Sequence, residues 1–319
     1  MQRQWMSLGL VMFLVCFLVG CDGQGGRTVG EQATTAAVTN GRSWLWARQQ
    51  RDGSWPDDGS QFPGGSTALA SWAMLASGVE LDNPNLSRAL NYLAGLETNM
   101  TYTLAIRANV WAEAAKLDKA KYQPLLGRDI RALTRGTKEG SYSYQTDDPA
   151  VLGDQSNSHY AVMGVERARE NNIEVPAAYW KMVMNYWLKV QNRDGGWPYS
   201  RSGTPSTETM TTAAIATLAL CMDKLGPDRT AQAAIDRGAA WLEKQMPESL
   251  SQNRLMYYYF LALGRMEDLT GRGSLGGVDL SKRVRAELLA RQMPDGGWEG
   301  VWGRDIASAY AVLVLSRDN

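Results

Sequence analysis

One pattern occurs three times in this chain: a glutamine is followed four residues later by a glycine and six residues later by a tryptophan. Each copy follows a stretch with apolar residues at helical spacing. Glycine allows the backbone to reverse after a helix, and tryptophan can fold back over the turn. The Gln amide can satisfy backbone groups left unpaired at a helix end. The repetition therefore predicts a repeated helix–turn module. Its residues are Gln49, Gly53 and Trp55, then Gln191, Gly195 and Trp197, then Gln292, Gly296 and Trp298.

Helical patterns dominate from about residue 36, and they come in pairs. An amphipathic segment is followed by a segment that is apolar on nearly every side, which must be buried all round. Six half-exposed helices around six buried ones predict an all-α fold with concentric layers, in one domain over residues 36–319. The outer segments are 40–50, 86–97, 122–134, 177–191, 230–245 and 280–292. The inner segments are 67–77, 103–117, 158–169, 209–225, 255–269 and 305–316.

The N-terminus reads as a targeting segment. Arg3 precedes an apolar run over residues 6–20, which is short for a membrane span and the right length for a signal peptide. The run ends in Leu18-Val19-Gly20-Cys21, which resembles the lipobox of bacterial lipoproteins. That resemblance implies a signal peptide over residues 1–20 and a lipid on Cys21. A flexible tether would follow over 21–35. An uncleaved anchor and an ordinary signal peptide are the alternatives.

Composition limits the classes of partner. Lys plus Arg and Asp plus Glu number 33 each, and no basic run occurs, so nucleic acid is not an expected partner. Twelve Trp and thirteen Tyr accompany only four Phe. Amphipathic rings of this kind suit turn packing and also carbohydrate or lipid cavities. The membrane, through lipidated Cys21, is the expected partner, which places the protein in the cell envelope facing the periplasm or the exterior.

The pattern aromatic-Leu followed by Gln-x-x-x-Gly-x-Trp resembles the QW repeat of squalene–hopene and oxidosqualene cyclases. The wider group of proteins with this fold includes protein prenyltransferase β subunits. The resemblance covers about residues 36–319 and implies an (α/α)6 toroid, with an inner ring of helices around a central cavity. The six helix pairs found from periodicity agree with that number.

The resemblance places functional residues where the inner helices begin, at one rim of the cavity. Hopene-type cyclases protonate an alkene with an acid in an Asp-x-Asp-Asp motif. The nearest match is Asp154-Gln155-Ser156-Asn157, which keeps only the first acid. Asp154 is therefore the candidate catalytic residue, and an ordinary helix N-cap is the alternative reading. The further candidates for the rim or binding site are Ser156, Asn157, His159, Glu208, Arg254, Tyr257, Arg304 and Asp305.

Two other activities of this fold were compared with the same positions. Protein prenyltransferases hold zinc with Asp, Cys and His, but His159 and Cys221 lie more than three helical turns apart in depth. We therefore expect no metal and no cofactor. Some polysaccharide lyases are also α/α toroids, and Arg254, Arg304 and Asp305 could serve such chemistry, with Trp302 stacking on a sugar. A surface or capping pair of Arg304 and Asp305 is the alternative.

The sequence thus predicts a membrane-tethered toroid that binds a ligand or partner in its central cavity without standard cyclase or zinc prenyltransferase chemistry. Apolar, isoprenoid and glycan ligands all remain open. One alternative is an enzyme, either a divergent terpenoid cyclase or a polysaccharide lyase-like protein. Another is a structural module whose cavity is filled by its own side chains. The lining should discriminate, because Trp, Tyr and Met alone favour lipid, whereas converging Arg, Asp and Asn favour a glycan.

Overall fold

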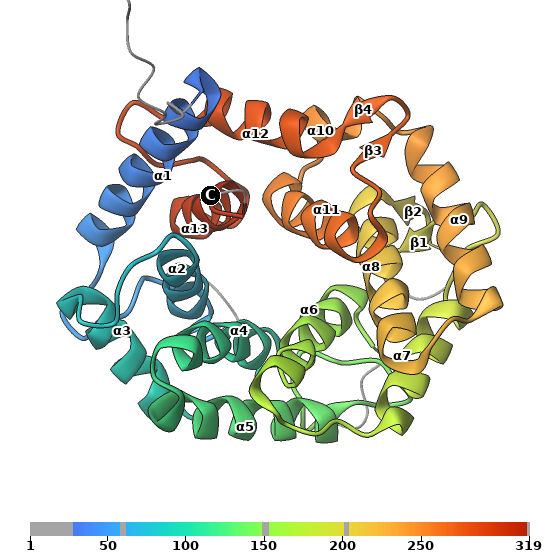
Figure 1. Ribbon diagram of the computed structural model, residues 1–319, viewed down its shortest axis with the longest axis horizontal. Helices are drawn as coiled ribbons and strands as arrows, with labels where there is room; N and C mark the ends of the chain where they lie inside the picture. Colours follow the sequence, from blue (N-terminus) through green and yellow to red (C-terminus); the bar gives the residue numbers. More distant parts are fainter. Residues whose placement is uncertain (1–27, 58–61, 149–152, 201–203, 318–319) are drawn as a thin grey trace, which may run out of the picture.

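The computed structural model describes residues 28–57, 62–148, 153–200 and 204–317. Six inner helices form a closed ring in which each contacts the next, and six outer helices surround them (Figure 1). The expected (α/α)6 toroid is confirmed. The inner ring comprises α2 (Gly65–Ala76), α4 (Thr101–Leu117), α6 (Gln155–Glu166), α8 (Glu208–Leu225), α11 (Met256–Thr270) and α13 (Arg304–Leu315). The outer ring comprises α1 (Val29–Arg48), α3 (Pro84–Gly95), α5 (Lys119–Gly136), α7 (Ala177–Lys189), α9 (Arg229–Glu243) and α12 (Leu280–Arg291).

Short elements connect the rings. A 3-10 turn, η1 (Arg169–Asn171), follows α6, and a one-turn helix, α10 (Ser249–Gln252), precedes α11. Two small antiparallel hairpins pair β1 (Trp197–Pro198) with β2 (Ser206–Thr207), and β3 (Ser274–Leu275) with β4 (Val278–Asp279). No helix in the described ranges is long and apolar enough to cross a membrane.

The first helix begins earlier than expected. The α1 helix starts at Val29, so the flexible tether predicted over 21–35 is wrong for residues 29–35. Thr28 and Glu31 form a capping box there, in which the Thr28 side chain accepts from the Glu31 N–H and the Glu31 carboxylate accepts from the Thr28 N–H. The Thr-x-x-Glu spacing is a sequence signature of a helix N-terminus, so this start could have been predicted. Cys21 and the predicted signal peptide lie outside the described residues.

Each Gln-Gly-Trp turn joins three helices. In the third copy, the Trp298 indole donates to the carbonyl of Leu288 in the preceding outer helix, at 2.8 Å. The Trp298 N–H donates to the Ser308 hydroxyl of the following inner helix, at 2.9 Å. The Gln292 amide donates to its own turn at Gly296 and to the carbonyl of Ala37 in the neighbouring outer helix, both at 2.9 Å. Equivalent bonds from Gln and Trp recur in the copies at Gln49 and Gln191.

The glycine of each turn packs against the backbone of that same neighbouring helix. Gly296 has a φ of +93°, and a Cβ added there would lie 2.8 Å from the carbonyl oxygen of Asn40. Asn40 lies three residues after Ala37, the residue that receives the Gln292 amide. Because Gly53 and Gly195 meet Arg88 and Arg237 in the same way, the turn needs glycine both for its backbone angle and for this close approach.

A fourth copy is present although its Gln and Trp have changed. Gly140 has a φ of +88° and approaches the Met182 backbone of α7. The Tyr142 N–H donates to the Ser158 hydroxyl at 2.9 Å, as the Trp N–H groups do elsewhere. The Tyr142 hydroxyl reaches α7 by donating to the Tyr179 hydroxyl at 3.0 Å. Here tyrosine supplies the bond to the next outer helix that Gln supplies in the intact copies.

Between α3 and α4 a buried arginine supplies the connection that a turn supplies elsewhere. Arg107 of α4 donates to the Leu93 and Leu96 carbonyls at the end of α3, at 3.1 and 2.7 Å. It also forms a bidentate ion pair with Asp129 of α5, which accepts from the Trp111 indole as well. Both charged side chains are buried. Removing one partner of such a pair leaves an uncompensated buried charge.

We expect Gln292→Ala to lower the free energy of unfolding by about 1–3 kcal/mol, because it leaves two part-buried carbonyls without their donor. Urea titration followed by tryptophan fluorescence measures this loss. Gln232→Ala is the matched control, because Gln232 is exposed on outer helix α9 and its side-chain amide donates to the Asp236 carboxylate one turn on. Equal stability of the two variants would contradict the role given to Gln292.

Candidate functional site

A wide groove opens on the rim where the inner helices begin. It has a volume of about 870 Å³ and lies between the start of α8, the α10 turn, the start of α11 and the loop before α13. Its size is within the range of ligand sites. The lining residues are Tyr199, Thr207, Glu208, Thr209, Gln245, Glu248, Ser249, Gln252, Asn253, Arg254, Leu255, Val301 and Trp302.

The groove combines an exposed aromatic ring with unpaired charges. Trp302 is 44% exposed, although large apolar side chains are otherwise mostly buried in this chain. Glu208, Glu248 and Arg254 line the same groove, and none of the three forms an ion pair within the part of the chain that the structure describes. The groove therefore offers one stacking surface, two carboxylates and one guanidinium, none of them paired with another charge in the described ranges.

Polar side chains hold the floor of the groove in place. The Asn253 amide donates to the Thr209 hydroxyl at 3.1 Å, and its carbonyl oxygen accepts from the Leu255 N–H at 2.8 Å. Ser249 and Tyr259 share a hydrogen bond at 3.2 Å. Burial raises the pKa of Tyr259 above its usual range, and the nearby Glu208 carboxylate raises it further. These bonds fix α8, α10 and α11 relative to one another, so the groove walls are preformed.

Asp154 is the N-cap of α6. Its Oδ1 atom accepts from the Asn157 N–H at 2.8 Å and from the Asn157 side-chain amide at 3.0 Å, and the Ser156 hydroxyl donates to it as well. Ser156 and Asn157 thus occupy the cap of α6 together with Asp154. This is the capping arrangement that the sequence left open as the alternative.

The centre of the ring is filled by tyrosines. The hydroxyls of Tyr102 and Tyr160 both lie within hydrogen-bonding distance of the Tyr310 hydroxyl, at 3.2 and 2.5 Å. Tyr160 and Tyr258 stack with their ring centroids 4.6 Å apart. Burial raises the pKa of each of these four phenols, so all remain protonated donors at neutral pH. The expected open central cavity is thus largely occupied by the chain itself at this level.

His159 lies inside the ring rather than at the rim where the sequence placed it. It is 1% exposed, and its Nδ1 lies 2.9 Å from the Tyr258 hydroxyl. Burial, reinforced by the charge of Arg265, lowers its pKa from 6.5 to about 3. The imidazole is therefore neutral at physiological pH.

Arg304 and Asp305 do not line the groove. Asp305 is 4% exposed and forms a bidentate pair with Arg48 at the end of α1, at 2.5 and 2.8 Å. Arg304 binds the carboxylate of Asp295 in the third turn and lies over the Trp44 ring at 4.8 Å. Both residues fasten α13 to the turns and helices around it.

Three of the predicted rim residues lie at the groove or next to it: Glu208, Arg254 and Tyr257. The first two line the groove, and Tyr257 lines a narrow cleft that shares Arg254 and Trp302 with it. The Tyr257 hydroxyl donates to the Glu299 carbonyl at 2.7 Å, which positions the loop that carries Trp302. The sequence missed the amide side chains of Gln245, Gln252 and Asn253. The signal was the degenerate turn after Gln245, where the loss of Gly and Trp accompanies the short helix α10.

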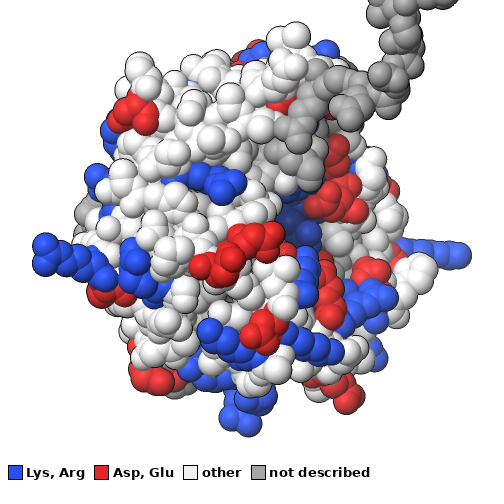
Figure 2. Space-filling view, turned by 60° about the vertical axis from the view of Figure 1, so that its left-hand side comes forward, with Lys and Arg blue, Asp and Glu red and all other residues white. Residues whose placement is uncertain are grey.

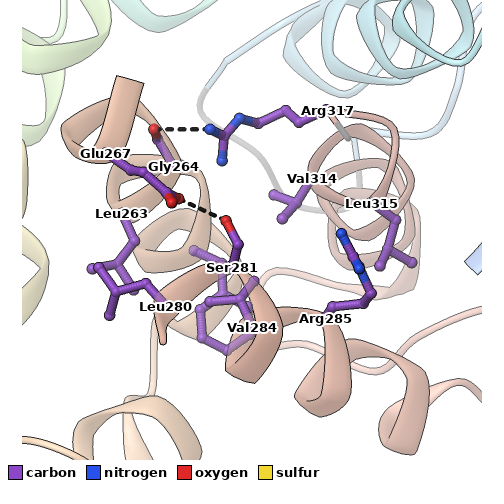
Figure 3. Close-up of a pocket in the computed structure, with 11 residues that line it drawn as sticks. Leu263, Gly264, Glu267, Leu280, Ser281, Val284, Arg285, Val314, Leu315 and Arg317 are labelled. Atoms are coloured by element: carbon purple, nitrogen blue, oxygen red, sulfur yellow. Dashed lines mark hydrogen bonds between the residues drawn. The ribbon is translucent and has the colours of Figure 1, made fainter. Parts of the chain in front are cut away.

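Two other surface features are less suited to a ligand. A small cavity between α11, α12 and α13 has a volume of only about 20 Å³, and its Glu267 and Gly264 are already bonded to Ser281 and Arg317 (Figure 3). The face in Figure 2 shows basic and acidic side chains interspersed, without a large patch of one sign. Within the described ranges, no group of three or more His, Cys, Asp or Glu residues is arranged to hold a metal ion.

The double ring and its repeated turns define a terpenoid cyclase-like α/α toroid. No family model matches the chain. Among curated proteins it is similar to drimenyl diphosphate synthase from Streptantibioticus cattleyicolor, with 32% identity over 145 residues, and to drimenyl diphosphate synthase from Streptomyces showdoensis, with 29% identity over 203 residues. These matches cover 42% and 59% of this chain, but only 26% and 35% of the relatives.

Solved structures with the same fold include a terpene cyclase, a possible GH105 family member and a polysaccharide lyase. The type II terpene cyclase MstE from Scytonema matches with a TM-score of 0.60 and 13% identity, covering 90% of this chain and 98% of that one. A possible GH105 family member from Salmonella enterica matches with a TM-score of 0.55 and 12% identity, covering 92% and 95%. A polysaccharide lyase matches with a TM-score of 0.55 and 12% identity, covering 88% and 52%. At these identities the likeness establishes the fold alone.

The low pKa of His159 makes stability depend on pH in a defined window. The unfolded state binds a proton at His159 below about pH 6.5, whereas the folded state does so only near pH 3. The contribution of His159 is thus complete above pH 6.5 and is lost as pH falls towards 3, with a slope of up to about 1.4 kcal/mol per pH unit. Urea unfolding of the wild type and His159→Gln between pH 7 and 4 should show the steeper loss in the wild type. Parallel pH profiles would contradict the assignment, and the chain's single histidine makes the comparison direct.

Proposed function

We propose that this protein is a ligand-binding toroid that takes a saccharide-like ligand in its rim groove. The observation that carries the proposal is the lining, in which the exposed Trp302 ring lies beside amides, two carboxylates and one guanidinium that form no ion pair among the described residues. Apolar ring faces and hydroxyl groups alternate on a sugar. An indole can stack on the former, while amide and carboxylate groups hydrogen-bond the latter. The fold likeness to a polysaccharide lyase and a GH105-type protein supports the same ligand class.

Two observations argue against standard cyclase chemistry at the centre of the ring. Asp154 is occupied as a helix cap, and Ser156 and Asn157 stand where the cyclase motif has its other acids. The tyrosines at the centre occupy space that a folded isoprenoid chain would need. Binding at the rim accounts for both observations.

Cyclisation of an isoprenoid is the second candidate function, and the similarity to drimenyl diphosphate synthases favours it. One solved structure of MstE contains geranylgeranyl dihydroxybenzoate as substrate, so this fold can hold an isoprenoid in that protein. Incubating the full-length protein with linear isoprenoid diphosphates, followed by mass spectrometry of the extracted products, decides between the two. Formation of a cyclic product would overturn the binding proposal.

We expect the full-length protein, purified in detergent, to bind members of a panel of neutral and charged oligosaccharides in calorimetric titrations. Trp302→Ala should weaken that binding about tenfold, equivalent to roughly 1.4 kcal/mol, because the stacking surface is lost. Trp241→Ala is the matched control, since Trp241 lies on outer helix α9 and its indole bonds to Asp194 outside the groove. If no oligosaccharide binds, or if Trp302→Ala binds as well as the wild type, the proposal fails.

The proposed location is the bacterial cell envelope, with the toroid tethered through a lipid on Cys21. The support is the Leu18-Val19-Gly20-Cys21 sequence after an apolar run. We expect Cys21→Ser to abolish incorporation of labelled palmitate in a bacterial host and to release the toroid from its lipid anchor. Cys16→Ser, within the same apolar run, should leave labelling unchanged. Equal labelling of both variants would exclude Cys21 as the lipidated residue.

A further inference from the structure

The facing surfaces of α6 and α8 contain a buried polar track. His159 of α6 lines a small cavity with Ala216 and Thr217 of α8, and its volume of about 10 Å³ is near the smallest that can hold one water molecule. Gln155 lies one helical turn nearer the rim on the same face of α6. Ala213 lies one helical turn before Thr217 on α8, and its side chain is small.

Three polar atoms on this track have no hydrogen-bond partner within the described residues. They are the amide nitrogen and oxygen of Gln155 and the Nε2 atom of His159. Gln155 is 0% exposed and His159 is 1% exposed, while the other ring nitrogen of His159 is already engaged with Tyr258. Buried polar groups in folded proteins nearly always have a partner, and ordered water supplies it where the protein does not.

The rim end of this polar track lies next to residues that line the groove. Thr209 lines the groove and lies one turn above Ala213 on α8. Tyr199 also lines the groove, and its hydroxyl interacts with Ser156, the residue next to Gln155. The groove floor and the upper end of the track are therefore neighbours. At the lower end, the cavity also contacts the ion pair of Glu166 with Arg265.

We propose that a file of ordered water molecules runs between α6 and α8 and connects the rim groove with the imidazole of His159. Gln155 anchors the upper part of the file through both amide atoms, and His159 Nε2 binds its inner end. The file provides a route by which a proton can pass between solvent in the groove and the buried His159–Tyr258 pair. The inference goes beyond saccharide binding and does not depend on which ligand the groove takes.

The test uses the fact that His159 is the chain's only histidine. The full chain is labelled with [13C,15N]histidine in detergent micelles, and cross-relaxation between water and the His159 ring protons is measured by NMR. We expect a water cross-peak in the wild type and a loss of at least half its intensity in Gln155→Met, which keeps the side-chain length but removes both polar atoms. Gln123→Met is the control, because Gln123 on outer helix α5 bonds to the Asn171 carbonyl away from the track.

The absence of a water cross-peak in the wild type would overturn the proposal, as would an unchanged cross-peak in Gln155→Met. If Gln155→Met does not fold, a crystal structure of the wild-type chain at better than about 1.5 Å decides the matter. Water oxygens within hydrogen-bonding distance of Gln155 and of His159 Nε2 would support the file, and a dry interface would refute it. Neither result bears on oligosaccharide titrations, so failure of the file and failure of the proposed function can be told apart.

Discussion

A hydrogen bond joins the first and the last helix of the outer ring. The Gln292 amide, near the end of the chain, donates to the carbonyl of Ala37 in the first helix. The same Gln-to-neighbour bond occurs at Gln49 and Gln191, but there it joins helices that are close in sequence. The third copy joins the last outer helix to the first, and it closes the row of helix pairs into a ring together with the packing of α13 against α1 and α2. Arg48 and Asp305 reinforce the same seam from the inside.

Closing the ring determines where a ligand can be held. Four inner helices, α4, α6, α11 and α13, bring tyrosine side chains to a common axis, and these side chains contact one another through hydroxyl groups and ring stacking. Because the axis is filled, space for a ligand remains at the rim. There the turn after Gln245 has lost its Gly and Trp. There α10 replaces the compact turn, and the groove opens beside it. A weakened repeat copy and the candidate site therefore have the same location.

The sequence predicted the fold well because repeat spacing and helical periodicity are local properties. The three intact turns and the alternation of half-exposed and buried helices were sufficient for the (α/α)6 architecture. Local spacing also led to one error, since Thr28 and Glu31 were not recognised as a helix cap. The residues that each turn contacts on the neighbouring outer helix, such as Ala37 and Asn40, were not predictable. Nothing in the local sequence of a turn identifies which helix it will pack against.

The candidate site was predictable only in part, for the same reason. Glu208 and Arg254 follow from their positions near the inner-helix starts. Arg304 and Asp305 have equivalent sequence positions, yet they face Asp295 and Arg48 because of how α13 meets α1. Helix-start position alone does not tell which way a side chain points. The amide side chains of Gln245, Gln252 and Asn253 come from the segment around α10, which does not follow the repeat pattern.

The seam at Gln292 and Ala37 also has a consequence for the topology of the chain. The α13 helix contacts both α1 and α2, so the last helix lies beside the first two, and the ring has no structural beginning (Figure 1). A polypeptide with this property can be circularly permuted in principle: its existing ends are linked, and new ends are opened in another connection between helices. The packing of the ring therefore does not by itself determine where this chain has its ends.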